Sequence, residues 1–330
     1  MNTTTNASSC TTAMNSTVYK IGATIAYCAI AVVSLVGNSC IGMTFYRTRT
    51  LRKPINFFII NMAISDLVSP MVFGMRNVTG LYLDSWLVTG NIGKILCKVP
   101  QVLVDVSLLV SVQSLVLISV DRFGAVVFPF RSPLITSERC PLLILATWII
   151  AVASMFPLPL AHILQPHQRV AEKCSSLWDE TIGRVDWLAE YLLFVYVAFV
   201  FIPVALLIII HSIIFIKLKS RQIPGEQSTG SLEKQRAIQN ANVLKMALAI
   251  VLGFIVCWLP STIDYFLRFV VRDSYACGYV IYKEIAWFFL ASACAVNPCI
   301  CFTFSGNYRE GLKRLLKCCS SQVAEQEVVH

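Results

Sequence analysis

Charged residues are scarce in this chain of 330 residues: only 14% of the side chains are Asp, Glu, Lys or Arg, whereas 56% are apolar. An ordinary soluble domain carries about 25% charged residues, so the composition excludes that class. The sequence also lacks a glycine-rich phosphate loop, an HExxH zinc motif and a GxSxG nucleophile turn. We therefore expect an integral membrane protein that is not an enzyme and needs no enzymatic cofactor.

Internal repeats are absent as well, which disfavours a secondary transporter, because such proteins are built from paired repeats with broken helices. His162 and His167 lie five residues apart near a loop, but no third ligand follows at a spacing typical of a metal site. Apart from the sodium candidate described below, we predict no metal site.

Seven long apolar segments occupy most of the sequence. Most of them contain no charge over roughly twenty residues, which is the length that a helix needs to cross a bilayer. They predict an all-α integral membrane fold, a bundle of seven transmembrane helices. The segments are residues 21–46, 55–75, 96–120, 141–164, 191–216, 243–271 and 279–304.

The distribution of basic residues predicts the orientation. Most of the 27 lysines and arginines fall in segments that are cytoplasmic if the N-terminus is outside, which is the arrangement that the positive-inside rule favours. Sequons at Asn2, Asn6 and Asn15 agree, because N-glycans are added on the outer side. We expect a plasma-membrane protein with a cytoplasmic C-terminus. Its net charge of +9 suits anionic lipid headgroups, so no nucleic-acid partner is expected.

Several polar side chains interrupt the apolar segments. Asp66 lies in the middle of the second segment, where a charge is costly unless it faces a polar interior or binds an ion. Asn38, Ser111 and Asn297 are also mid-span and are candidates to meet Asp66 in a small hydrated cluster. Two interpretations stay open: a site for a monovalent cation, and a purely architectural hydrogen-bond network.

Prolines and one charged pair indicate where the bundle can move. Pro203, Pro260 and Pro298 lie inside the last three segments, and proline removes a backbone hydrogen bond and kinks a helix. Asp121-Arg122-Phe123 follows the third segment, about 25 residues beyond Cys97, or roughly 37 Å along a helix. One membrane-crossing helix therefore carries an outer cysteine at one end and an acid-base pair at the other, an arrangement suited to passing a signal.

In this order and spacing the motifs resemble those of the rhodopsin-like (class A) G-protein-coupled receptors. The chain is similar in character to peptide and neuropeptide receptors and is not an opsin, because Ala291 stands where opsins carry the retinal lysine. The resemblance covers about residues 20–319. The matching motifs are Gly37-Asn38 (GN), Asn61 to Leu67 (NLAxxDL), Asp121-Arg122-Phe123 (DRY), Trp148, Pro203, Phe254 to Pro260 (FxxCWxP) and Asn297-Pro298 (NPxxY).

This resemblance implies a receptor that binds an extracellular ligand and promotes nucleotide exchange on a heterotrimeric G protein through Arg122. A sodium ion held by Asp66, Ser111 and Asn297 would favour the closed state. The residues implied for the switch are Asp121, Arg122, Phe123, Asn297 and Pro298. Those implied for the activation core are Val112, Pro203, Phe254, Trp258 and Pro260.

The resemblance also chooses among the cysteine pairings. Cys10, Cys97, Cys174 and Cys277 fall in the predicted outer segments, and four cysteines can pair in three ways. The family joins the cysteine at the top of the third helix to one in the second outer loop, which implies a Cys97–Cys174 disulfide. Cys10 and Cys277 are the candidates for a second one.

The sequence says less about the ligand than about the class of receptor. Val104 stands where amine receptors carry an aspartate, and Asp105 follows one position later. Mixed charges and aromatic groups around the expected mouth favour a peptide; a small biogenic amine that contacts Asp105 is the alternative. The candidate ligand-binding residues are Arg76, Gln101, Val104, Asp105, Tyr265, Arg268, Lys283 and Trp287, and Glu190, Asp264 and Glu284 lie nearby.

The C-terminal part predicts an amphipathic helix on the inner leaflet, because apolar and basic residues alternate there at helical spacing. Cys318 and Cys319 follow it and are candidates for palmitoylation. We divide the chain into an extracellular N-terminus (1–20), a seven-helix domain (21–304), the amphipathic helix with its palmitoylation site (305–319) and a short tail (320–330).

Four positions depart from the family pattern. Phe123 and Cys301 replace the tyrosines of DRY and NPxxY, and His211 replaces a tyrosine of the fifth helix. Asn240 stands where some members carry a glutamate that locks the arginine. The missing tyrosines keep a second alternative open, a seven-helix scaffold or scavenger that binds ligand without signalling.

The missing glutamate predicts measurable signalling without ligand, because the closed state lacks one of its restraints. In cells that express the receptor at matched surface levels, second-messenger output should exceed that of an Arg122→Ala variant. Equal output from the two proteins would contradict this prediction.

Overall fold

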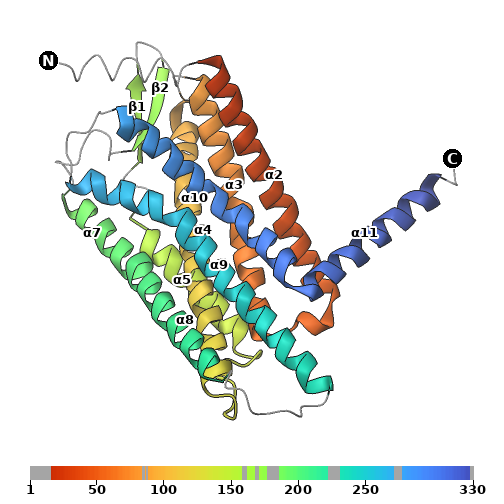
Figure 1. The fold of residues 1–330 in the computed structure, drawn as a ribbon. Coiled ribbons are helices and arrows are strands. Elements are labelled where there is room, and N and C mark those ends of the chain that lie inside the picture. The colour runs from red at the N-terminus through yellow and green to blue at the C-terminus, as the bar shows by residue number, and fades with distance from the viewer. Residues whose placement is uncertain are drawn as a thin grey trace.

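A computed structural model describes residues 16–83, 86, 88–157, 162–167, 171–176, 186–221, 231–270 and 277–327. Within these residues, seven helical rods pack side by side and one further helix leaves the bundle at an angle (Figure 1). The rods are α2 (Thr17–Arg47), α3 (Pro54–Tyr82), α4 (Gly90–Val127), α5 (Cys140–Met155), the continuous rod of α7 (Asp186–Tyr196), η3 (Val197–Phe201) and α8 (Ile202–Arg221), α9 (Ser231–Val270) and α10 (Cys277–Phe304). The departing helix is α11 (Gly306–Glu327), and a short 3-10 turn, η1 (Arg49–Leu51), joins α2 to α3.

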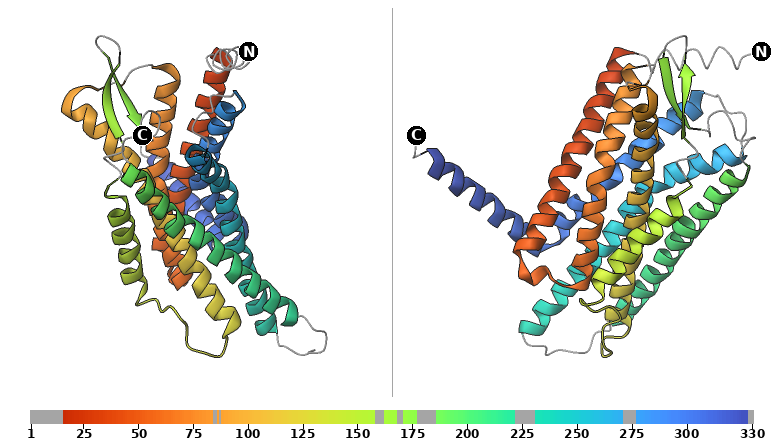
Figure 2. Two further views of the ribbon diagram at one scale, coloured as in Figure 1. Left: turned by 90° about the vertical axis from the view of Figure 1, so that its left-hand side faces the viewer. Right: turned by 180° about the vertical axis from the view of Figure 1, so that it is seen from behind.

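The bundle has two functionally different ends. A two-stranded antiparallel hairpin of β1 (His162–His167) and β2 (Ala171–Ser176) stands at the end where α2 begins (Figure 2). We call this the hairpin end. The opposite end, here the Arg122 end, carries the last turns of α4 and α8, the start of α9 and the start of α11.

The predicted seven-helix bundle is confirmed, with one correction in the fourth helix. Among the residues that the structure describes, six helices are long and apolar enough to cross a bilayer. The predicted fourth segment, 141–164, is wrong in length, because α5 ends at Met155 and β1 already begins at His162. Pro157 helps to end the helix because it has no N–H to donate to a carbonyl of the preceding turn, although Phe156 before it still has helical φ and ψ.

Other boundaries also differ from the sequence prediction. Helix α8 continues past its apolar segment to Arg221, and α9 begins before its apolar segment, at Ser231. The C-terminal helix continues to Glu327, beyond the predicted limit at residue 319. On its exposed face Arg314 donates to Glu310 at 2.6 Å, an i, i+4 pair that supports the helix and lowers the pKa of the Glu310 carboxyl.

The core is built around α4, which packs against α3, α5, α8 and α9. Its inward face is almost continuously buried from Val104 to Ile118, whereas large apolar side chains on the outer helices, such as Phe215 and Leu252, are exposed. This inside-out pattern suits a lipid environment, in which outward apolar residues replace surface charges.

Two glycines allow the helices to approach closely. A Cβ on Gly37 of α2 would lie 2.7 Å from Pro298 Cβ and Cγ of α10, and a Cβ on Gly253 of α9 would lie 2.8 Å from Val296 Cγ1. Small residues at such crossings let helices pack tightly where no hydrophobic effect drives their association.

A Gly37→Ala substitution should destabilise the bundle, because the added methyl group overlaps Pro298, and overpacking costs about 1–3 kcal/mol. Gly22→Ala on the same helix is the matched control, since nothing lies within 4 Å of its Cβ. Thermal unfolding of the purified protein should show a lower midpoint for Gly37→Ala and an unchanged or higher one for Gly22→Ala. Equal midpoints would contradict the predicted overlap.

Candidate functional site

The predicted polar cluster forms around Asp66 in the middle of the bundle. The Asp66 carboxylate accepts from Asn297 Nδ2 of α10 at 2.8 Å and from Ser111 Oγ of α4 at 3.1 Å. Ser111 also lies 2.9 Å from Ser65 Oγ, next to Asp66 on α3. Asp66 is 3% exposed, so three helices meet at one buried carboxylate.

Ser34 and Asn38 of α2 extend this cluster through backbone groups that prolines leave free. A proline cannot donate to the carbonyl four residues earlier, so Pro298 frees the carbonyl of Cys294. That oxygen lies 3.0 Å from Asn38 Nδ2 and 3.3 Å from Ser34 Oγ.

The same situation arises on α3, because Pro70 lies inside that helix and frees the carbonyl of Asp66. Ser34 Oγ lies 3.2 Å from this oxygen too. One hydroxyl of α2 is therefore within reach of proline-freed carbonyls on two neighbouring helices. The sequence prediction missed both Ser34 and Pro70; the signal for Pro70 was its place inside the second apolar segment, four residues after Asp66.

A second network of hydrogen-bonded polar side chains joins α3, α4 and α5. Asn61 Nδ2 donates to Ser114 Oγ at 2.9 Å and to Thr147 Oγ1 at 3.2 Å, while Trp148 Nε1 donates to Asn61 Oδ1 at 2.9 Å. The family motifs at Asn61 and Trp148 are thus in direct contact. Their polar groups form hydrogen bonds with one another at a depth where lipid offers no hydrogen-bond partner.

The donor set around Asp66 fits a hard monovalent cation. It contains a carboxylate, the hydroxyl of Ser111 and the amide of Asn297, and oxygen ligands suit hard cations. The Asn38 Oδ1 atom is buried and has no hydrogen-bond partner among the described residues, so a further oxygen acceptor stands beside the network. No group of three His, Cys, Asp or Glu side chains that could hold a metal occurs in the described part of the chain.

Asp121 and Arg122 form the expected pair at the Arg122 end of α4. Arg122 Nε donates to Asp121 Oδ2 at 3.0 Å, and a second guanidinium nitrogen reaches the same oxygen. Across the described ranges this is the single ion pair that Arg122 makes. The neighbouring Phe123 packs edge-on against Phe128, with ring centroids 6.0 Å apart.

Three residues of the predicted activation core share one hydrophobic cluster: Val112, Phe254 and Trp258. The Phe254 and Trp258 rings stack with centroids 4.9 Å apart, and Trp258 Nε1 is buried without a hydrogen-bond partner among the residues described. Pro203 follows the π-helical turn η3, a distortion that often marks functional positions in helices.

The kink at Pro260 is braced by contacts that the sequence did not indicate. Tyr282 of α10 donates to the Pro260 carbonyl at 2.6 Å, and Tyr279 donates to Asp264 Oδ1 at 2.9 Å. Asp264 is 2% exposed. Two phenols on α10 therefore hold the hairpin-end half of α9 beyond its proline, and only the packing of the two helices could reveal them.

Two of the departures from the family pattern, His211 and Cys301, lie in the buried core. His211 is buried, with Nδ1 2.9 Å from the Leu207 carbonyl, and Cys301 is buried beside the fully buried Tyr308 of α11. Tyr308 donates to Asn56 Oδ1 of α3 at 3.3 Å. A phenol therefore lies next to Cys301, but it is carried by α11.

The ligand candidates are only partly brought together. Gln101 and Val104 of α4 are buried, and Gln101 Nε2 donates to Asp105 Oδ2 at 3.3 Å. Lys283 and Trp287 of α10 are half-buried, and Glu190 is exposed. The side chains of Arg76, Tyr265 and Arg268 lie outside the described set.

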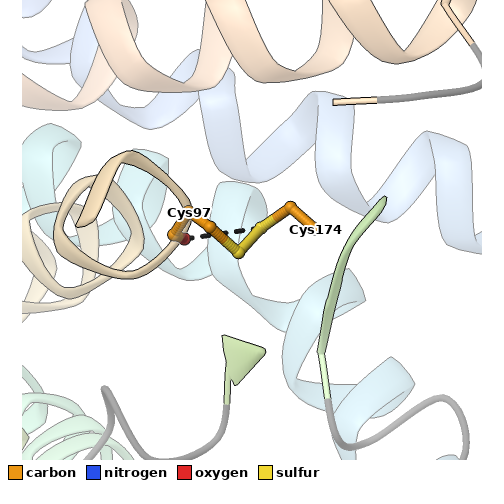
Figure 3. Close-up of a disulfide and its surroundings, with 2 residues drawn as sticks. All are labelled: Cys97 and Cys174. Carbon is orange, nitrogen blue, oxygen red and sulfur yellow. Dashed lines mark hydrogen bonds between the residues drawn. A yellow bond between two sulfur atoms is a disulfide. The ribbon is translucent and has the colours of Figure 1, made fainter. Parts of the chain in front are cut away.

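A disulfide joins α4 to the hairpin. Cys97 and Cys174 are bonded, with their Cα atoms 5.6 Å apart, and Cys174 Sγ lies 3.6 Å from the Cys97 carbonyl (Figure 3). This is the pairing that the family resemblance implied, and it ties β2 to α4, the helix that carries Arg122.

Several predicted modification sites lie outside the described residues or side chains. Asn2, Asn6, Asn15 and Cys10 precede the first described residue. Cys277, Cys318 and Cys319 lie on described helices, but their side chains are not described. The side chain of Asn240 is likewise not described.

The profile of the family described as "7 transmembrane receptor (rhodopsin family)" matches residues 37–300. The chain belongs to this family. It is similar to the substance-K receptor of Homo sapiens, with 27% identity over 295 residues, which cover 89% of this chain and 72% of that receptor. The RYamide receptor of Drosophila melanogaster is 28% identical over 312 residues, which cover 92% of this chain and 64% of that receptor. The substance-P receptor of Meriones unguiculatus is 24% identical over 302 residues, which cover 89% of this chain and 70% of that receptor.

The extent of the match separates two parts of this rhodopsin-family receptor. It begins at Gly37 and ends at Ile300, so it includes Asp66, Arg122 and Asn297. It excludes α11, where Tyr308 makes its contact to α3. The match therefore covers Asp66, Ser111 and Asn297 of the central polar network but not Ser34, and the packing of α11 is seen in this structure alone.

Proposed function

We propose that this receptor binds a peptide at its hairpin end, outside the cell, and promotes nucleotide exchange on a heterotrimeric G protein at its Arg122 end, in the cytoplasm. The basic residues concentrated at the Arg122 end support this orientation in the plasma membrane. Family membership supports coupling to a G protein. The signalling part of the proposal is carried by one observation: Arg122 is held by its neighbour Asp121 alone among the described residues, so one broken pair exposes it.

Two observations support a peptide ligand. The receptors similar to this chain carry the names substance K, substance P and RYamide. The hairpin end also presents charged and aromatic side chains over a wide area, from Lys20 and Tyr82 to Lys283 and Trp287, and a β hairpin pinned by a disulfide. An extended ligand with several side chains suits such a surface better than a single small cation.

The geometry supports a route for the signal. Ligand contacts at the hairpin end would change the packing of Trp258 and Phe254, and the part of α9 beyond Pro260 would move relative to the rest. The Arg122 end of α9 would then swing outward and open the space that a Gα subunit needs. The ligand must bind the open state more tightly than the closed one, because differential affinity alone shifts such an equilibrium.

Reconstitution with G-protein heterotrimers tests this function. Screening a peptide library should find ligands that accelerate GDP–GTP exchange, and Arg122→Ala should reduce that exchange to the rate without receptor while ligand binding persists. Arg47→Ala, an exposed arginine at the same end of the bundle, is the control and should leave exchange unchanged.

Other outcomes of this screen would favour the alternatives. Binding of a peptide without exchange would indicate a scaffold or scavenger, which the absence of tyrosines at positions 123, 211 and 301 favours. Exchange driven by a biogenic amine and lost in Asp105→Ala would indicate an amine receptor. Exchange that survives Arg122→Ala would remove Arg122 from the mechanism.

We also propose that Asp66, Ser111 and Asn297 bind a sodium ion that stabilises the closed state. The buried oxygen donors and the unpartnered Asn38 Oδ1 support this site. The ion would neutralise Asp66, and its binding would oppose the motion of α10 against α3 and α4.

Replacing KCl by NaCl at equal ionic strength should raise the thermal midpoint of the ligand-free receptor. A ligand at ten times its Kd stabilises the native state by about 1.4 kcal/mol. Asp66→Asn should abolish the difference between the two salts, whereas Asp264→Asn, which alters another buried carboxylate, should keep it. A sodium effect that persists in Asp66→Asn would place the ion elsewhere.

A further inference from the structure

A cavity of about 590 Å³ lies at the Arg122 end, beside the last turn of α4 and the loop that joins α4 to α5. Its lining includes Arg131, Ser132 and Arg139 together with the apolar side chains of Phe128, Phe130 and Leu134. Neither the switch nor the polar network described above uses this cavity. Its lining combines basic and polar side chains with apolar ones.

The charges of the cavity suit an anion. Neither Arg131 nor Arg139 forms an ion pair in the part of the chain that the structure describes. Glu138, which precedes Arg139 in the sequence, is exposed, and Asp121 of α4 is paired with Arg122. Two guanidinium groups can each present parallel N–H donors to phosphate oxygens, and the Ser132 hydroxyl adds another donor.

The cavity is held in shape by its surroundings. The Arg131 guanidinium carbon lies 5.3 Å from the centroid of the Phe128 ring, a cation–π contact that restrains its position. Leu134 packs directly onto Gly124 of α4, where a Cβ would lie 2.8 Å from Leu134 Cδ1. Ile135 and Cys140 are buried, so the second half of the loop is anchored at the start of α5.

The rim indicates where the anion comes from. Phe130 is 99% exposed, and Phe128 and Leu134 are also exposed, so an apolar edge borders the basic pocket. A soluble phosphate would leave this edge in water, whereas a membrane lipid offers its glycerol and acyl region to it. In the orientation proposed above, the cavity opens at the inner leaflet, which carries the anionic lipids.

We propose that this cavity binds the phosphate ester of an anionic inner-leaflet phospholipid, with Arg131 and Arg139 as ligands of the headgroup. A polyphosphoinositide suits it better than a phosphodiester lipid, because its monoester phosphates carry more charge and offer each arginine a bidentate partner. The proposal concerns lipid recognition and is independent of which extracellular ligand the receptor binds.

The test is lipid binding by the full-length, ligand-free receptor in nanodiscs of phosphatidylcholine that contain a small fraction of phosphatidylinositol 4,5-bisphosphate. Both leaflets are accessible there, so the result does not depend on the proposed orientation. Native mass spectrometry counts the bound lipid. R131Q/R139Q should weaken binding by about tenfold for each arginine removed, the loss expected for a charge-assisted hydrogen bond.

R49Q/R52Q is the matched control: it removes the same charge from exposed arginines at the same end of the bundle, in the connection between α2 and α3. It should bind the lipid like the unaltered receptor. R131K/R139K should recover part of the lost affinity. If R131Q/R139Q does not fold, the single variants R131Q and R139Q carry the same comparison.

Three results would overturn the proposal. Equal losses in the two double variants would show a diffuse attraction of the whole basic face. Inositol 1,4,5-trisphosphate binding as tightly as the lipid would make the source a soluble phosphate. Unchanged lipid binding by R131Q/R139Q, with weaker G-protein coupling in nanodiscs of phosphatidylcholine alone, would make the arginines a protein contact instead.

Discussion

The structure depends on how two prolines are tolerated inside lipid-embedded helices. Pro70 and Pro298 each leave a backbone carbonyl without its helical partner, and an unsatisfied carbonyl costs several kcal/mol in a bilayer. Ser34 and Asn38 of α2 donate to these oxygens, at Asp66 and Cys294. These hydrogen bonds join α2 to α3 and α10. The contacts that satisfy the two carbonyls therefore also fix the positions of the three helices.

The hydrogen bonds to the carbonyls that the prolines leave free also position the carboxylate of Asp66. Asp66 supplies its carbonyl to Ser34 and its carboxylate to Ser111 and Asn297, so one residue is bonded to three other helices through backbone and side chain together. Asn297 directly precedes Pro298 and therefore moves with the kink. A change in the geometry of α10 would alter the contacts of Asp66 and, through Ser111, those of α4, the helix that carries Arg122.

The sequence predicted those features that depend on residue type and on position along one helix. Asp66, Ser111 and Asn297 stand out because polar side chains in apolar segments are costly, and Asp121-Arg122 stands out by its distance from Cys97. Contacts between helices could not be predicted in this way. Ser34 looks like an ordinary small residue of an apolar segment, and Tyr282 shows no sign that it will reach the Pro260 carbonyl. The fourth helix was predicted too long because apolar residues continue past Pro157.

The departures from the family pattern acquire a physical meaning at the Arg122 end. Cys301 leaves a smaller side chain where the family has tyrosine, and the phenol of Tyr308 is buried against this position from α11 while it donates to Asn56 of α3. Near the Arg122 end, α11 thus adds a second contact to α3 beside the direct bond from Asn297 of α10 to Asp66 of α3. If α10 moves relative to α3 on activation, α11 either moves with it and loses the contact to Asn56 or keeps that contact and changes its angle to α10, so the position of α11 is coupled to the balance between the two states.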